Sequence, residues 1–153
     1  MTKKVLIGLL IIFLVLQAFR PTRNSGDAMT NHDITHAVAV PDTVLGVLKS
    51  SCYDCHSNHT NYPWYTNINP IGLWLQHHVN EGKEELNFSE FGNYSHRRGA
   101  HKMDEIVEQL QVREMPLKSY LILHGNARLN EEQAAMIINW ASEAKTVIAD
   151  SLK

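Results

Sequence analysis

Cysteine is scarce in this sequence: of its 153 residues, only Cys52 and Cys55 are cysteines. Two residues so close together leave none for a four-cysteine zinc site or a network of disulfides. Glycine and proline are also few, with 8 and 5 residues, and no stretch of alternating apolar and polar residues predicts a strand. Lysine and arginine do not cluster, so we expect no nucleic-acid partner.

The two cysteines belong to the segment Cys52-Tyr53-Asp54-Cys55-His56, which has the pattern Cys-x-x-Cys-His. This pattern is typical of the attachment site of a c-type haem. Two thiols three residues apart can each form a thioether with a vinyl group of the same haem, and the next imidazole can bind the iron. We therefore predict one covalent haem c on Cys52 and Cys55, with His56 as the proximal iron ligand.

Three other interpretations of the cysteine pair remain open. A thioredoxin-type redox pair would need a βαβ context, which the sequence does not indicate. A zinc site would need further ligands, and His59 is close enough in sequence to be one. A structural disulfide between residues three apart is geometrically awkward.

The N-terminal segment, residues 1–20, is predicted to direct export. Lys3 and Lys4 precede an unbroken apolar run from Val5 to Leu16, but no small-x-small cleavage site follows. We expect an uncleaved hydrophobic helix that enters the membrane through residues 5–19, with a cleaved signal peptide as the alternative. Both interpretations place the domain on the periplasmic side of a bacterial inner membrane, which agrees with attachment of haem c outside the cytoplasm.

The rest of the chain divides into a polar linker, residues 21–40, and one domain, residues 41–150. Apolar residues recur in the domain at helical spacing, which predicts an all-α fold. Helices are expected from Asp42 into the cysteine pair, from Pro70 to about Glu85, from about Ala100 to Val112, and onward from Asn130. A shorter turn or helix is expected from Leu117 to His124. Asn130 and Gln133 match a capping box at the start of the last helix.

A haem iron in an electron carrier usually takes a second protein ligand, for which there are two candidates. Met115 precedes Pro116, and a residue before proline is biased away from helical geometry. We expect its thioether on an extended segment from which it can reach the iron. His78 is the alternative, because it falls on the apolar side of the helix predicted after Pro70. A methionine ligand would raise the reduction potential relative to histidine.

The segment after the motif is expected to contribute Tyr62, Pro63 and Trp64 to the haem pocket. An iron-binding imidazole needs an acceptor for its Nδ1 proton, and the carbonyl of Tyr62 or Pro63 is a candidate. Trp64 could pack on the haem edge or bind a propionate, with simple core packing as the alternative.

Several separated motifs also match, in order, those of one known family. They include the segments 52–58 and 62–65 and the tripeptide Glu114-Met115-Pro116. Further matching positions are Pro70, Trp74, His78, Glu81, Gly82, Leu86, Asn87, Phe88, Ser89, Tyr120, His124, Ala127, Leu129 and Trp140. Over about residues 38–145 the chain resembles the bacterial haem-binding domain family of cytochrome c-like proteins.

The resemblance implies covalent haem at Cys52 and Cys55, a proximal His56 and Met115 as the distal ligand. It also implies a cytochrome c-like helical domain around one haem, here preceded by an N-terminal hydrophobic helix. The family is poorly defined functionally, so the resemblance implies no particular partner or reaction.

The function expected from these features is electron transfer by a membrane-tethered periplasmic protein with a His/Met-ligated iron, and not enzymatic catalysis. Its partner would be a redox protein, and a basic one is favoured because acidic residues predominate after residue 20. One alternative is a haem-based sensor or small-ligand-binding module, in which Met115 or His78 leaves the iron. Another is a peroxidase-type enzyme with His78 and Glu81 or Glu85 above an open iron.

Overall fold

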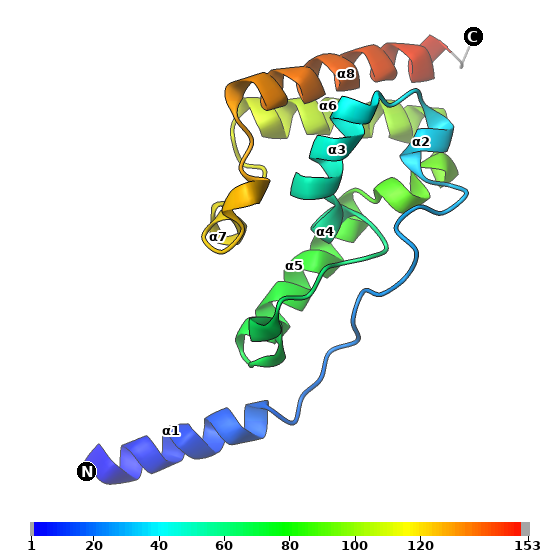
Figure 1. Ribbon diagram of the computed structural model, residues 1–153. Helices are drawn as coiled ribbons and strands as arrows, with labels where there is room; N and C mark the ends of the chain where they lie inside the picture. The colour runs from blue at the N-terminus through cyan, green and yellow to red at the C-terminus, as the bar shows by residue number, and fades with distance from the viewer. Residues whose placement is uncertain (1, 151–153) are drawn as a thin grey trace.

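A computed structural model of the protein describes residues 2–150, in which helices are joined by irregular segments, the longest of them at residues 17–33 (Figure 1). The longer helices are α1 (Thr2–Leu16), α3 (Asp42–Ser51), α5 (Ile71–Glu85), α6 (His96–Gln111) and α8 (Glu131–Asp150). The short elements are α2 (Ile34–Ala37), α4 (Tyr53–His56), α7 (Lys118–Leu121) and the 3-10 turns η1 (Trp64–Asn67), η2 (Phe88–Asn93) and η3 (Gly125–Ala127). Apart from an isolated bridge between Ser25 and His59, these residues form no β-structure, which fits the all-α class.

The fold prediction is wrong for the N-terminal segment. Helix α1 has 15 residues, about 22 Å at the usual rise per residue, whereas the hydrocarbon core of a bilayer is about 30 Å thick. Within residues 2–150, no helix combines the length and the apolar character that crossing a membrane requires. Met1, which also belongs to the predicted segment, lies outside the described residues. The prediction of a membrane helix at these positions is corrected, because α1, which occupies them, does not meet those requirements.

Helix α1 ends at Leu16, and the side chain of the next residue makes polar contacts with the domain. The Gln17 amide donates to the Asn69 carbonyl and accepts from the Asn69 backbone N–H, both at 3.0 Å. No residue of α1 is buried, and Figure 1 shows the helix extending away from the others. This one point of attachment leaves the α1 surface exposed along its length.

The segment expected to be a linker instead packs partly into the domain. Ile34 and Val38 lie four residues apart and both are buried in the core. Asp33 caps the intervening helix α2 through the Thr35 N–H, and its other carboxylate oxygen accepts a hydrogen bond from Tyr53 (3.0 Å). The sequence around Asp33 is polar, so its pattern did not predict that Ile34 and Val38 would be buried.

The core lies where α6 and α8 run antiparallel, with α3 packed against α8 (Figure 1). Helix α6 contributes the buried stripe Met103, Ile106 and Leu110, whose three- and four-residue spacing is the helical periodicity on which the prediction of this helix depended. The Trp140 indole on α8 donates to the Ala39 carbonyl (3.0 Å), which holds α8 against the segment before α3. This packing fixes the helices that surround the candidate site.

The observed helix boundaries test the sequence prediction directly. Helix α3 begins at Asp42 as predicted, although the capping position is Pro41. The capping box before α8 is confirmed: Asn130 and Gln133 exchange hydrogen bonds of 2.8 and 3.0 Å between side chain and backbone. Helix α6 begins at His96, earlier than predicted, because the Ser95 hydroxyl caps a first turn that carries no apolar side chain.

Candidate functional site

A cavity of about 560 Å³ separates the α3–α4–α5 side of the domain from the α6–α7–α8 side. Cys52, Cys55 and His56 line it, together with His78 and Met115. Its apolar lining includes Leu48, Phe88, Ile106, Leu110, Leu129 and Ile137. Cofactor sites are typically concave, mainly apolar and roughly 300–1,000 Å³ in volume. The structure therefore gathers the cysteine motif and both candidate distal ligands around a space of suitable size.

Both cysteines are free thiols in an environment that disfavours the thiolate. Burial raises the pKa of Cys52 to about 12, with a further contribution from Cys55. Burial also raises the pKa of Cys55 to about 11, and the neighbouring Asp54 adds to the rise. A redox-active pair of thioredoxin type needs a lowered thiol pKa, so these surroundings argue against that interpretation.

The zinc interpretation finds no support in the described part of the chain. Residues 2–150 contain no group of three or more metal-binding side chains arranged to hold a metal ion. His59, the additional ligand considered from the sequence, is exposed and its Nδ1 contacts the Gly26 carbonyl at 3.1 Å. It therefore lies away from a position where it could complete a site with the cysteines.

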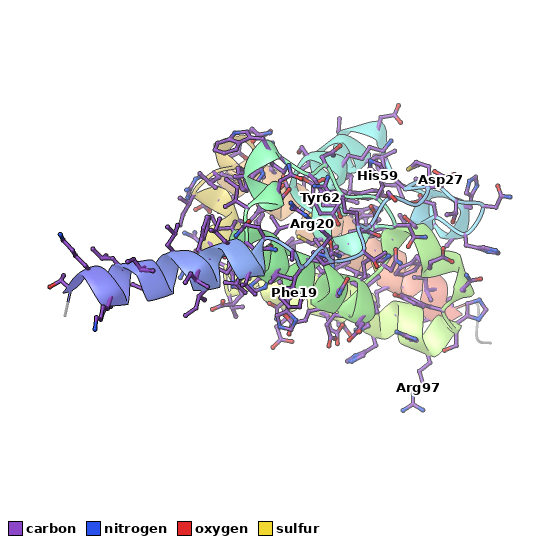
Figure 2. All side chains as sticks on the ribbon, turned by 90° about the horizontal axis from the view of Figure 1, so that it is seen from below. Phe19, Arg20, Asp27, His59, Tyr62 and Arg97 are labelled. Atoms are coloured by element: carbon purple, nitrogen blue, oxygen red, sulfur yellow. The ribbon has the colours of Figure 1, made fainter. Side chains whose placement is uncertain are left out.

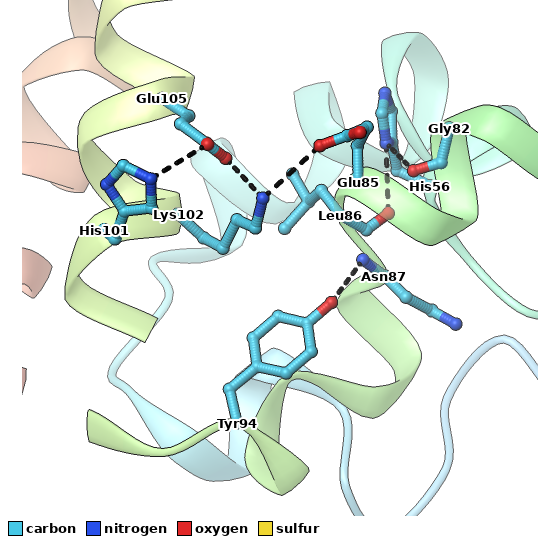
Figure 3. Close-up of polar contacts among 9 residues, drawn as sticks. All are labelled: His56, Gly82, Glu85, Leu86, Asn87, Tyr94, His101, Lys102 and Glu105. Atoms are coloured by element: carbon cyan, nitrogen blue, oxygen red, sulfur yellow. Dashed lines mark hydrogen bonds and ion pairs between the residues drawn. The ribbon is translucent and has the colours of Figure 1, made fainter. Parts of the chain in front are cut away.

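The His56 imidazole is held through Nδ1 by two backbone carbonyls at the end of α5, those of Gly82 (2.8 Å) and Leu86 (3.1 Å) (Figure 3). Burial lowers the pKa of His56, and the two hydrogen bonds partly oppose that effect. In the neutral ring, an Nδ1–H that donates to these carbonyls leaves the Nε2 lone pair free for a metal. An iron-binding histidine requires such an acceptor for the proton on its other ring nitrogen.

The acceptor predicted from the sequence was wrong. The chain leaves the motif toward η1, so the carbonyls of Tyr62 and Pro63 are not the partners of His56. Helix α5 returns to the motif instead and presents Gly82 to it. A Cβ atom at Gly82 would lie 2.8 Å from the Cys55 carbonyl oxygen, so the absence of a side chain permits this approach.

Tyr62, Pro63 and Trp64 do not line the 560 Å³ cavity. The Tyr62 hydroxyl accepts from the Asn24 N–H (2.8 Å) and donates to Gln76 (2.7 Å). It borders a separate cavity of about 410 Å³ that it shares with Arg20; both are labelled in Figure 2. Trp64 begins η1 and is 76% exposed. Pro63 borders a smaller cavity of about 70 Å³ that also contacts Cys55 and His78. The pocket role of Tyr62, Pro63 and Trp64 stays a prediction, and of the three only Pro63 lies in a cavity shared with the motif.

Met115 approaches the cavity from the segment that follows α6. Arg113 adopts a φ of 58°, a left-handed conformation that is common just after a helix, and turns the chain there. His78 reaches the same cavity from α5, with its ring centroid 4.4 Å from that of Trp74. Its Nδ1 atom is buried and has no hydrogen-bond partner among residues 2–150. The two candidate distal ligands thus come from opposite sides of the cavity.

A family model described as a haem-binding domain matches residues 11–143, most of the chain. The chain belongs to the haem-binding domain family. This confirms the family resemblance and supports haem as the ligand of the protein. No curated protein and no solved structure matches the chain.

The cavity of this haem-binding domain fits its ligand in chemistry as well as in volume. The two thiols and an imidazole with a supported Nδ1 lie along one apolar chamber. Cys52, Cys55 and His56 are therefore the residues that would hold the haem.

A buried lysine ties the two sides of the haem-binding domain together (Figure 3). Lys102 on α6 is within 2.6 Å of Glu105 and 3.6 Å of Glu85 at the end of α5. Its side chain is only 9% exposed, so the two carboxylates must replace the hydration that the buried ammonium group has lost. Glu85 and Glu105 both line the cavity. The helical pattern of the sequence did not reveal this contact.

A second contact joins the motif to the segment after Met115. The Tyr120 hydroxyl donates to Asp54 (2.8 Å), and its ring stacks on His124 with centroids 4.0 Å apart. Burial, followed by the negative charge of Asp54, raises the pKa of Tyr120, which keeps the hydroxyl protonated as a donor. Sequence reasoning assigned no role to Asp54, although an acidic residue inside the cysteine motif was a visible signal.

Proposed function

We propose that this haem-binding domain carries one covalent c-type haem and transfers electrons. The observation that carries the proposal is the position of Cys52 and Cys55 in the same cavity as His56, whose Nδ1 is already hydrogen-bonded. The two thiols would form thioethers with the vinyl groups, and His56 Nε2 would bind the iron. A haem bound in this way supplies one-electron exchange between ferric and ferrous iron.

We assign the distal position to Met115 and keep His78 as the alternative to be tested. Met115 enters from the α6–α7 side, whereas His56 is held by α5 on the other side. An iron-binding histidine normally donates its other ring N–H to an acceptor, and His78 has none for its Nδ1 among the described residues. A thioether has no such requirement.

Two further parts of the proposal concern location and partner. Residues 1–20 have the basic start and apolar run of a signal peptide, which supports export to the periplasm. Glu81, Glu85 and Glu108 are exposed around the cavity, which supports a redox partner with a basic docking surface. Fractionation of cells and N-terminal sequencing of the mature protein test the export step.

Ligation is tested by comparing two methionine variants of the purified haem protein. We expect Met115→Leu to lose the far-red charge-transfer band of methionine-ligated ferric haem while keeping the covalent haem. Met103→Leu is the matched control, because Met103 is buried in α6 and does not line the cavity. Retention of the band in Met115→Leu would contradict the assignment.

The sensor and peroxidase alternatives both require an open iron position, which a bound Met115 would close. Rapid and complete binding of carbon monoxide to the reduced protein would favour the sensor. Turnover of hydrogen peroxide with a reduced donor would favour the peroxidase. An electron carrier with Met115 bound is expected to show neither property.

A further inference from the structure

The cavity contains a surplus of negative charge. Among the described residues that line it there is no lysine or arginine, whereas five carry carboxylates: Asp54, Glu81, Glu85, Glu105 and Glu108. A haem in this space would add two propionate groups, each of which needs a hydrogen-bond donor if it is shielded from water. The cavity must therefore supply donors other than the usual basic side chains.

Most nearby side-chain donors already have partners. His56 Nδ1 is bound to carbonyls, and the Tyr120 hydroxyl donates to Asp54. Lys102 does not line the cavity and is paired with two glutamates. The lining side chains of His78 and Gln109 make no hydrogen bond within residues 2–150. They are therefore the two candidate donors for a haem propionate.

The burial of one ring nitrogen determines what His78 can do. Its Nδ1 is enclosed without an acceptor, so a proton there would have no hydrogen bond. The neutral ring is therefore expected to carry its proton on Nε2, the nitrogen that remains to meet a ligand in the cavity. An iron ligand needs the opposite tautomer, with Nε2 unprotonated and Nδ1–H donating, which is what His56 has. His78 is thus suited to donate a hydrogen bond and poorly suited to bind iron.

We propose that His78 is a positioning residue whose Nε2–H donates to a haem propionate, an assignment that rests on haem occupying the cavity as proposed above. The Trp74 ring packs against the imidazole and restricts it to the cavity wall. The hydrogen bond holds one haem carboxylate beside α5. It also withdraws negative charge from that carboxylate, which favours the ferrous state.

The test compares three substitutions at position 78 in the haem-loaded protein. Glutamine can place an amide N–H near the position of the histidine Nε2, whereas asparagine places it near Nδ1 and leucine has no donor. We expect His78→Leu and His78→Asn to shift the propionate bending band in the resonance Raman spectrum and to lower the reduction potential. His78→Gln should retain most of the wild-type band position and potential. Gln109→Leu, the control on the opposite side, should leave both unchanged.

The competing outcomes are distinct from one another. If His78→Leu and His78→Asn keep the wild-type band and potential, or if only Gln109→Leu changes them, the assignment of His78 is wrong. If the His78 variants lose six-coordinate low-spin haem while Met115→Leu keeps it, His78 is the iron ligand and the inference is overturned. A pyridine haemochrome assay of the wild-type protein separates these results from failure of the proposed function, since that failure would leave no covalent haem at all.

Discussion

The close approach of α5 to the cysteine motif can be tested by Gly82→Ala. The added Cβ would lie 2.8 Å from the Cys55 carbonyl oxygen and 3.1 Å from its Cβ, and neither atom is the end of a flexible side chain. We expect overpacking to cost about 1–3 kcal/mol, against which alanine gains about 1 kcal/mol in helix propensity. The net loss of folding stability is about 0–2 kcal/mol. Because the Gly82 carbonyl accepts from His56, the same displacement would also weaken that hydrogen bond.

The matched control is Gly46→Ala in the middle of α3. A Cβ there meets no atom within 4 Å, so the substitution should stabilise the protein by about 0.5–1 kcal/mol. Urea unfolding of both variants measures the difference, and the NMR signal of the His56 Nδ1 proton in the reduced haem protein reports on its hydrogen bond to Gly82. Equal stabilisation by the two substitutions, with an unchanged Nδ1 proton signal, would refute the reasoning about Gly82.

Three other contacts give predictions of defined size. Tyr120→Phe removes the donor to Asp54 and should cost about 1–2 kcal/mol in urea unfolding, and the effect should largely disappear in an Asp54→Asn background. Lys102→Met leaves Glu105 without its 2.6 Å partner and should destabilise the domain by about 1–2 kcal/mol in urea unfolding. Asn130→Ala removes the capping box of α8 and should lower the thermal midpoint by an amount equivalent to about 1 kcal/mol.

The sequence predicted features that depend on local spacing. The helix from Asp42, the stripe on α6 and the capping box at Asn130 all follow from residues within one or two turns of each other. The family was also recognisable, because several short motifs occur in a fixed order. Local patterns therefore accounted for most of the longer helices and for the class of ligand.

The contacts that complete the site depend on residues far apart in the chain. The carbonyl acceptor for His56 is 26 residues away at Gly82, and sequence reasoning placed it wrongly in the adjacent turn. Tyr120 is 66 residues from Asp54. The N-terminal prediction failed for a different reason: composition indicates an apolar run, but the helix it forms has only 15 residues. The residue after it contacts Asn69, which is 52 positions away in the chain.

The central claim is that the two cysteines attach a haem covalently, and a mass measurement on protein matured in a host that attaches haem c tests it most directly. We predict a mass that exceeds the polypeptide by one haem, a pyridine haemochrome spectrum of the c type, and colour that stays with the protein after extraction with acidified acetone. A Cys52→Ala, Cys55→Ala double variant should lose all three properties. A wild-type protein with the mass of its amino acids alone, or one that releases its haem to the solvent, would contradict the account.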